Sequence, residues 1–174
     1  MISFMETTTQ LSAQRPVILE ADGGEHFHFL GNLATVKVSA DTEGQLSVVE
    51  FLAPRGFGPP LHRHNDEDEL FVILEGELVI RTGDTEQVGD EGTVALLPRA
   101  VPHSFQVTSE SARFLNVTAA SSGPPQFDRM VTALGVPSRE AVMPGPMDID
   151  PAEVAAVCAA HGIDVLGPPP PPLD

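Results

Sequence analysis

The sequence contains one cysteine, Cys158, and neither tryptophan nor tyrosine. No disulfide can form within the chain, which excludes the disulfide-stapled class of secreted domains. Basic residues are also scarce, because 9 lysines and arginines stand against 25 acidic residues, for a net charge of −16. A chain this acidic is not expected to bind nucleic acid or an anionic membrane, since both would repel it.

Long apolar runs are missing as well. No stretch approaches membrane-spanning length, and the first residues lack the basic and apolar segments of a secretory signal peptide. These absences predict a soluble, cytoplasmic protein. The 174 residues, 41% of them hydrophobic, suffice for the core of one domain.

Short apolar runs, separated by Gly, Pro, Asp and Asn, fill the region between residues 17 and 118. Several of them alternate apolar and polar residues, a pattern that predicts an all-β sandwich or barrel. The tripeptide at 75–77 stands between two such runs and is interpreted as a tight hairpin turn. The expected strands are 25–30, 34–38, 45–52, 70–74, 78–82, 93–97, 105–108 and 113–118.

Beyond residue 121 the pattern changes. Apolar residues at helical spacing predict a helix over 126–134, and Asp150 followed by Pro151 predicts the start of a second helix that runs to about residue 160. The five prolines at 168–172 are expected to be extended and flexible. The predicted segments are a flexible start (1–15), a β-barrel (16–121), an arm with two short helices (122–166) and a proline-rich tail (167–174).

The strongest signal is a spaced set of polar residues within the predicted barrel. Gly56, His62, His64, Glu69 and Gly76 follow the pattern G-x5-H-x-H-x4-E-x6-G. On a strand, His62 and His64 project from the same face because they are two residues apart. Asp66, Glu67 and Asp68 lie between the histidines and Glu69 and are interpreted as a solvated loop.

A second pattern, G-x5-P-x4-H, comprises Gly92, Pro98 and His103. His103 can join the earlier three polar residues at one metal ion, because strands distant in sequence meet inside a barrel. Imidazole nitrogens and a carboxylate oxygen suit Fe, Ni, Co, Mn, Cu or Zn. A metal site is therefore the leading hypothesis for function.

The two patterns resemble the conserved motifs of the cupin superfamily, the first at all five positions. In the second, Ala100 stands where the family has a glycine and Val107 where it has an asparagine, and neither position is a metal ligand in the family. The family glycine serves a turn, so a positive φ at Ala100 would cost about 1 kcal/mol. The resemblance covers roughly residues 30 to 120. The C-terminal arm is similar, more narrowly, to single-domain bacterial cupins related to quercetin 2,3-dioxygenase.

The resemblance implies an antiparallel jelly-roll barrel with a metal inside, held by His62, His64, Glu69 and His103. In the quercetinase-like branch the glutamate also takes the flavonol hydroxyl proton, which implies a catalytic role for Glu69. A carboxylate beside a dication stays ionised and can accept a proton within hydrogen-bond reach. The leading interpretation is a metal-dependent dioxygenase that cleaves a flavonol or a related aromatic or enol substrate with O2.

Phenylalanines of the barrel are expected to form an apolar pocket for a flat substrate. Two alternatives stay open: a non-redox isomerase or cyclase that acts on a polyketide-like substrate with Zn, and a small-molecule-binding module without turnover. Family resemblance also implies a homodimer. The expected pocket residues are Phe51, Phe57, Phe71, Phe105 and Phe114.

Overall fold

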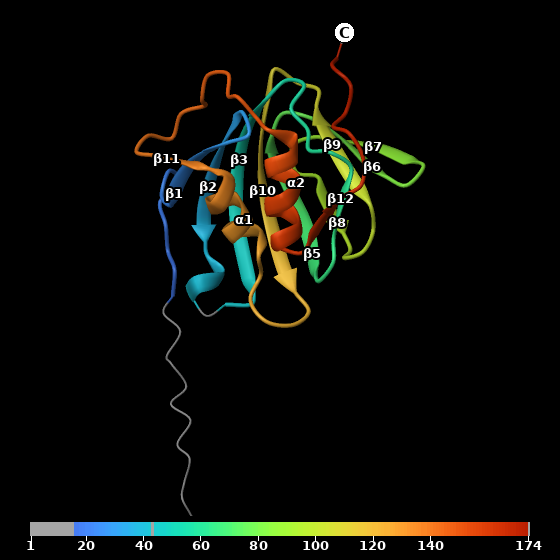
Figure 1. The fold of residues 1–174 in the computed structure, drawn as a ribbon. Coiled ribbons are helices and arrows are strands. Elements are labelled where there is room, and N and C mark those ends of the chain that lie inside the picture. Colours follow the sequence, from blue (N-terminus) through green and yellow to red (C-terminus); the bar gives the residue numbers. More distant parts are fainter. Residues whose placement is uncertain (1–15, 43, 174) are drawn as a thin grey trace, which may run out of the picture.

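The computed structural model describes residues 16–42 and 44–173, and it shows two antiparallel β-sheets that face each other (Figure 1). The flexible start predicted for residues 1–15 lies outside the described residues. The larger sheet contains β1 (Glu25–Phe29), β2 (Asn32–Val38), β3 (Leu46–Pro54), β5 (Glu67–Glu75), β8 (Val94–Leu97), β10 (Ser111–Ala120) and β11 (Val136–Ser138). Its seven strands lie in the order β11-β1-β2-β3-β10-β5-β8.

The smaller sheet has five strands in the order β12-β4-β9-β6-β7. They are β4 (His62–His64), β6 (Leu78–Thr82), β7 (Thr85–Gly89), β9 (His103–Val107) and β12 (Ile163–Val165). The molecule is an all-β antiparallel jelly roll with a short helical arm, which confirms the predicted fold class.

The core lies between the two sheets, and alternating side chains build it. In β3, β5 and β10 every second residue is buried, as expected for strands with one face toward a core. The ring of Phe114 contacts those of Phe51 and Phe71, with centroids 5.4 Å and 5.5 Å apart. Full burial of each such side chain stabilises the fold by about 1.5–3 kcal/mol.

The turn at Gly76 corrects one prediction from the sequence. The flanking strands β5 and β6 do not pair: β5 pairs with β10 and β8, whereas β6 pairs with β7 and β9. The turn therefore carries the chain from one sheet to the other and is not a hairpin. Gly76 has φ +81°, and a Cβ there would clash with the Ser111 carbonyl oxygen, so no larger residue fits.

Two helices pack on the barrel, the first against β1 and β3 and the second against β12. They are α1 (Phe127–Leu134) and α2 (Pro151–Ala160), both close to the predicted positions, and a 3-10 helix, η1 (Ala40–Thr42), follows β2. The Asp150 carboxylate accepts a hydrogen bond of 2.8 Å from the Ala152 N–H, which confirms the predicted cap. No helix in the described part of the chain is long and apolar enough to cross a membrane.

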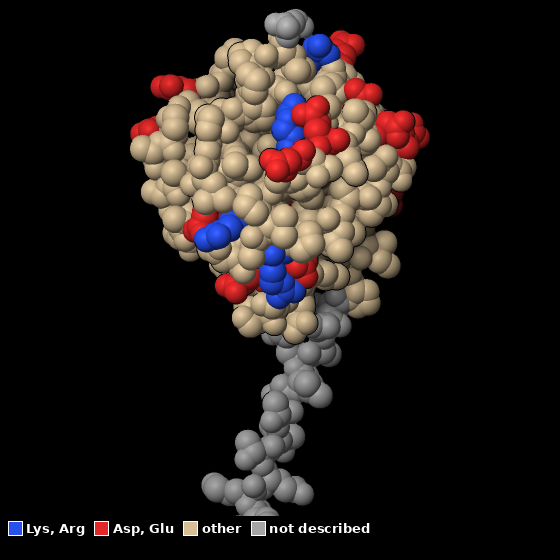
Figure 2. All heavy atoms as spheres, turned by 90° about the vertical axis from the view of Figure 1, so that its right-hand side faces the viewer, with Lys and Arg blue, Asp and Glu red and all other residues tan. Residues whose placement is uncertain are grey.

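The proline-rich tail is held against the barrel, contrary to the prediction that it is flexible. After β12, the Leu166 N–H donates to the Leu61 carbonyl at 2.7 Å, and the Gln106 side-chain amide donates to the Pro171 carbonyl at 2.7 Å. Figure 2 shows this side of the molecule, where charged side chains stand in small mixed groups on a mostly uncharged surface. Contacts with the barrel, which local composition does not reveal, fix the tail.

Candidate metal centre and cavity

The four residues singled out from the sequence meet between the two sheets. His62 and His64 lie on β4 and His103 opens the neighbouring β9, where it stands opposite His62 in register. Glu69 approaches from β5, in the other sheet. The four ligand atoms lie within 4.8 Å of one another, a spacing that could hold one metal ion. His62 is half-buried, and the other three side chains are 1–2% exposed.

Hydrogen bonds orient all three imidazole rings in the same sense. The Nδ1 atom of His62 donates to the Pro60 carbonyl at 2.8 Å, and that of His103 to the Val101 carbonyl at 2.9 Å. Because a carbonyl oxygen only accepts, the proton is on Nδ1 in both rings. His64 Nδ1 lies 3.2 Å from the Glu67 carboxylate, which accepts a hydrogen bond from it in the same way. In the neutral rings this leaves each Nε2 lone pair free for a metal.

The atoms aimed at the centre have no other partner. In the described part of the chain, His64 Nε2, His103 Nε2 and Glu69 Oε2 are buried without a hydrogen bond. His103 Nε2 lies 2.8 Å from Glu69 Oε2, but the contact lacks hydrogen-bond geometry. Buried polar atoms without partners are rare and costly. A metal ion would satisfy all three, so the donor set fits a transition metal of the kind that nitrogen and oxygen ligands prefer.

Electrostatic interactions among the four residues shift the pKa values of His62, Glu69 and His103. Burial, aided by repulsion from His103, lowers the pKa of His62 to about 4, so its ring is neutral at pH 7. Burial alone would raise the pKa of Glu69, but the neighbouring histidines outweigh it and lower that pKa to about 2. Burial would likewise lower the pKa of His103, but the carboxylate of Glu69 raises it above the ordinary value. The centre therefore offers an ionised carboxylate at neutral pH.

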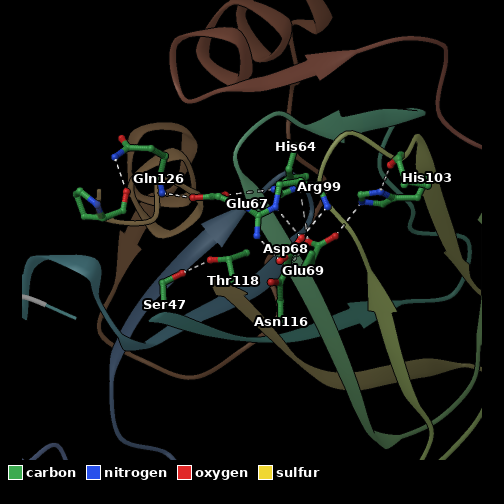
Figure 3. A network of polar contacts seen from close by, with 12 residues as sticks. Ser47, His64, Glu67, Asp68, Glu69, Arg99, His103, Asn116, Thr118 and Gln126 are labelled. Atoms are coloured by element: carbon green, nitrogen blue, oxygen red, sulfur yellow. Dashed lines mark hydrogen bonds and ion pairs between the residues drawn. The ribbon is translucent and has the colours of Figure 1, made fainter. Parts of the chain in front are cut away.

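Glu67 and Asn116 support the centre, and the sequence analysis missed both (Figure 3). Glu67, interpreted as part of a solvated loop, belongs to β5 and is 4% exposed; its other oxygen accepts from the Gln126 N–H. Asn116 is 2% exposed and donates from Nδ2 to Glu69 Oε1 at 2.5 Å. Strand alternation was the available signal, since Glu67 is two residues from Glu69 and Asn116 is two residues from the inward Phe114.

Asp68, which was also interpreted as part of the solvated loop, belongs to β5 as well, and its side chain faces outward. It forms an ion pair with Arg99, and its oxygens also accept from the Arg99 backbone N–H at 2.9 Å. This hydrogen bond fixes the turn before His103. The next residue, Ala100, has φ +61°, the left-handed conformation anticipated for the family glycine. Its N–H donates to the His64 carbonyl at 2.7 Å, so the strained residue also ties the turn to the ligand strand.

A cavity of about 950 Å³ opens beside the centre, and both His62 and Glu69 line it. Among the predicted pocket residues, Phe51, Phe57 and Phe105 line this cavity. Phe71 and Phe114 do not line it: they are 1% and 0% exposed and lie in the core. Three of the lining residues that were not anticipated come from the β1 end and from the two helices: Phe29, Phe127 and Cys158.

Comparison with known proteins is consistent with this geometry. Residues 48–118 match the cupin domain family. Quercetin 2,3-dioxygenase from Bacillus subtilis (strain 168) is 29% identical over 104 residues, which are 59% of this chain and 31% of that protein. The match thus spans about a third of that relative's length.

Two solved structures resemble parts of the chain. A cupin superfamily protein from Desulfitobacterium hafniense DCB-2 is 20% identical, with a TM-score of 0.47 over 52% of this chain and 78% of that one. The protein TT1209 from Thermus thermophilus is 30% identical, with a TM-score of 0.41 over 43% of this chain and 72% of that one. The motifs, the jelly roll and the matched domain together establish that this chain belongs to the cupin superfamily.

Proposed function

We propose that the protein is a metal-dependent dioxygenase of the quercetinase-like type, which cleaves a flavonol or a related aromatic or enol substrate with O2. In this proposal His62, His64, Glu69 and His103 hold one divalent transition metal. The name of the Bacillus subtilis relative supports the reaction type. A bound Fe, Ni, Co, Mn or Cu ion supplies the redox chemistry with oxygen, whereas Zn supplies Lewis acidity alone.

The observation that carries the proposal is the position of the cluster at the wall of an apolar cavity. A ring system placed there contacts aromatic side chains such as Phe51 and Phe105 while one end meets the cluster. Apolar walls exclude water from the reacting end, which strengthens electrostatic interactions inside the site. A flat substrate with an ionisable hydroxyl fits both parts of the site.

Glu69 is the proposed general base. Its low pKa keeps the carboxylate ionised, and the Asn116 amide holds Oε1. In this proposal Oε2, the oxygen aimed at the metal, turns away from it when the substrate binds and then accepts the proton of a substrate hydroxyl. Asn116 also lines the cavity, so it touches the region that the substrate occupies. We assign Asn116 the role of positioning the base.

The outer face of the large sheet suits a second copy of the chain. Val94 and Leu96 on β8 are 59% and 62% exposed, and they stand opposite Val72 and Leu70 of β5 in register. Contiguous exposed apolar side chains are typical of interfaces. We propose a homodimer through this face. Size-exclusion chromatography should give a dimer that the Leu96→Lys variant loses, and a monomeric wild type would contradict it. The predicted cytoplasmic location stays a prediction.

The first experiment is elemental analysis of untagged protein by plasma mass spectrometry, with His62→Ala as control. Near-stoichiometric Fe, Ni, Co, Mn or Cu that is lost in the control supports the proposal and justifies oxygen-uptake assays with flavonols. Stoichiometric Zn would favour the isomerase or cyclase alternative. No metal, even after reconstitution, would leave a binding module without turnover.

The second experiment separates catalysis from binding at Glu69. In Glu69→Gln the amide oxygen still accepts from Asn116, but the side chain no longer takes a proton. We expect oxygen uptake with a flavonol to fall at least about 100-fold, as for loss of a general base. Retained turnover in a variant that keeps its metal would contradict the assigned role.

A further inference from the structure

Residues 167–173, here called the C-terminal wall, form one side of the cavity. Figure 1 shows the red C-terminal segment running from β12 along the side of the barrel that carries β9. The members of the wall that face the cavity are Gly167, Pro168, Pro169, Pro170, Pro172 and Leu173.

Contacts along its length fix the wall in place. The Leu61 N–H donates to the Pro168 carbonyl at 3.3 Å, and Gln106, only 1% exposed, donates to the Pro171 carbonyl at 2.7 Å. At Gly58 an added Cβ would lie 3.1 Å from Pro170 Cγ, so the barrel loop and the wall touch. A run of prolines is stiff without help, so these contacts suffice to hold its shape.

The wall offers a ligand almost no hydrogen-bond donors, because proline has no N–H. Elsewhere around the cavity, the polar side chains among the described lining residues are Arg55, His62, Glu69 and Asn116, apart from the thiol of Cys158. Asn116 already gives its amide to Glu69, and the Arg55 guanidinium donates to the Thr108 carbonyl. Among the described lining residues, the side-chain donors and acceptors for a ligand therefore lie mostly at the metal end of the cavity, and the remaining N–H groups of Arg55 are the exception.

Such a distribution discriminates between classes of ligand. A hydroxyl that rests against the wall can donate to a proline carbonyl, but no proline N–H donates to its oxygen. It therefore loses part of the hydrogen bonding that water provides, which costs affinity. An aromatic ring in the same place loses nothing and buries apolar area against the proline rings. The lining thus penalises polar substituents far from the centre and rewards bare rings.

We propose that the C-terminal wall selects for flat, largely apolar ring systems whose oxygen substituents are gathered at one end, and against polyhydroxylated ligands. This inference rests on the proposed function for the reactive end of the substrate. Its test, however, is a binding measurement that needs no turnover.

The test uses the protein as purified, under argon, titrated with two probes and followed by their absorbance and fluorescence. The probes are 3-hydroxyflavone, which carries a single hydroxyl beside its carbonyl, and quercetin, which carries further hydroxyls on both ends. The test variant replaces Pro168, Pro169 and Pro170 by serine. Pro146→Ser, a proline outside the cavity lining, is the matched control.

We expect wild type and the control to bind 3-hydroxyflavone more tightly than quercetin. In the triple variant the affinity for 3-hydroxyflavone should fall about tenfold, equivalent to about 1.4 kcal/mol, with a smaller change for quercetin. Gln106→Leu, which removes the bond to Pro171, should change the affinities in the same direction with metal content unaltered.

Three outcomes would overturn the inference: no binding of 3-hydroxyflavone to wild type, unchanged affinity in the triple variant, or an equal loss for both probes. Failure of the proposed function is separate, because it shows as absent oxygen uptake in wild type. A wild type that binds selectively but takes up no oxygen refutes the dioxygenase and leaves the role of the wall intact.

Discussion

Glu67 is a side chain through which the centre can be changed without substituting a ligand. The rings of His62 and His103 are oriented by backbone carbonyls, which no substitution of another side chain removes. The ring of His64 depends on the Glu67 carboxylate, whose second oxygen accepts from the Gln126 N–H at the start of α1. Substitution at this position should therefore weaken both the metal site and the attachment of the helix.

The magnitude follows from the two donors. Glu67→Ala leaves His64 Nδ1 and the Gln126 N–H without an acceptor, and each buried unpaired group costs about 1–3 kcal/mol, so the free energy of unfolding should fall by about 2–6 kcal/mol. In Glu67→Gln the single side-chain oxygen accepts from one of the two donors, and the NH2 group faces the second donor. The free energy of unfolding should therefore fall by about half as much as in Glu67→Ala. Metal affinity should fall about 10–100-fold in either variant, as found for partners of ligand histidines.

Urea unfolding of the metal-free protein measures the first effect, and competition with a chromophoric chelator measures the second. Asp68→Asn is the control, because asparagine keeps an oxygen that accepts from the Arg99 N–H and loses only a partly exposed ion pair worth at most about 1 kcal/mol. If Glu67→Gln unfolded at the wild-type urea concentration and bound metal with wild-type affinity, the assigned role of Glu67 would be refuted.

Three further predictions concern the turn, the base and the metal. Ala100→Gly should raise the free energy of unfolding, measured in urea, by up to about 1 kcal/mol, because relief of the left-handed strain exceeds the added unfolded-state entropy. A lower urea midpoint than that of the wild type would show that Ala100 is unstrained despite its φ of +61°. In the wild type Asn116 Nδ2 lies 2.5 Å from Glu69 Oε1, so Asn116→Asp places a second carboxylate there and oxygen uptake should drop sharply. Asn116→Ser should retain part of the uptake, and equal rates in the two variants would argue that Asn116 does not position Glu69. A chelator should lower the melting temperature by roughly 5–11 °C if metal is present at about 100 times its Kd, an effect worth about 2.7 kcal/mol, and should leave His103→Ala unchanged.

The sequence predicted the inward faces of the strands well, because alternation is a local property that burial enforces. Residues on β4, β5 and β9 met as their spacing indicated. The same alternation extends to Glu67 and Asn116, yet their polarity favoured a solvated loop and an ordinary strand position. A buried polar residue is stable only through partners far away in sequence, and those partners are invisible to local patterns.

Pairing between distant segments explains the other errors. A glycine turn at Gly76 looks the same locally whether the next strand returns to its neighbour or crosses to the other sheet. The three-residue strand β12 exists because the edge of β4 is available to it, with Ile163 opposite His64. The proline run is fixed by Leu61 and Gln106, and neither contact follows from its composition.

The four cluster residues divide unequally between the sheets, three histidines from the smaller and Glu69 from the larger. A metal ion bound to all four would cross-link the two sheets. The lone cysteine of the chain cannot form a disulfide that would do the same. The cavity lies between the same two sheets. A ligand that increased their separation would also increase the distance between the Glu69 carboxylate and the three imidazole rings. Occupancy of the cavity and the strength of the metal bonds are then mechanically linked through the separation of the sheets.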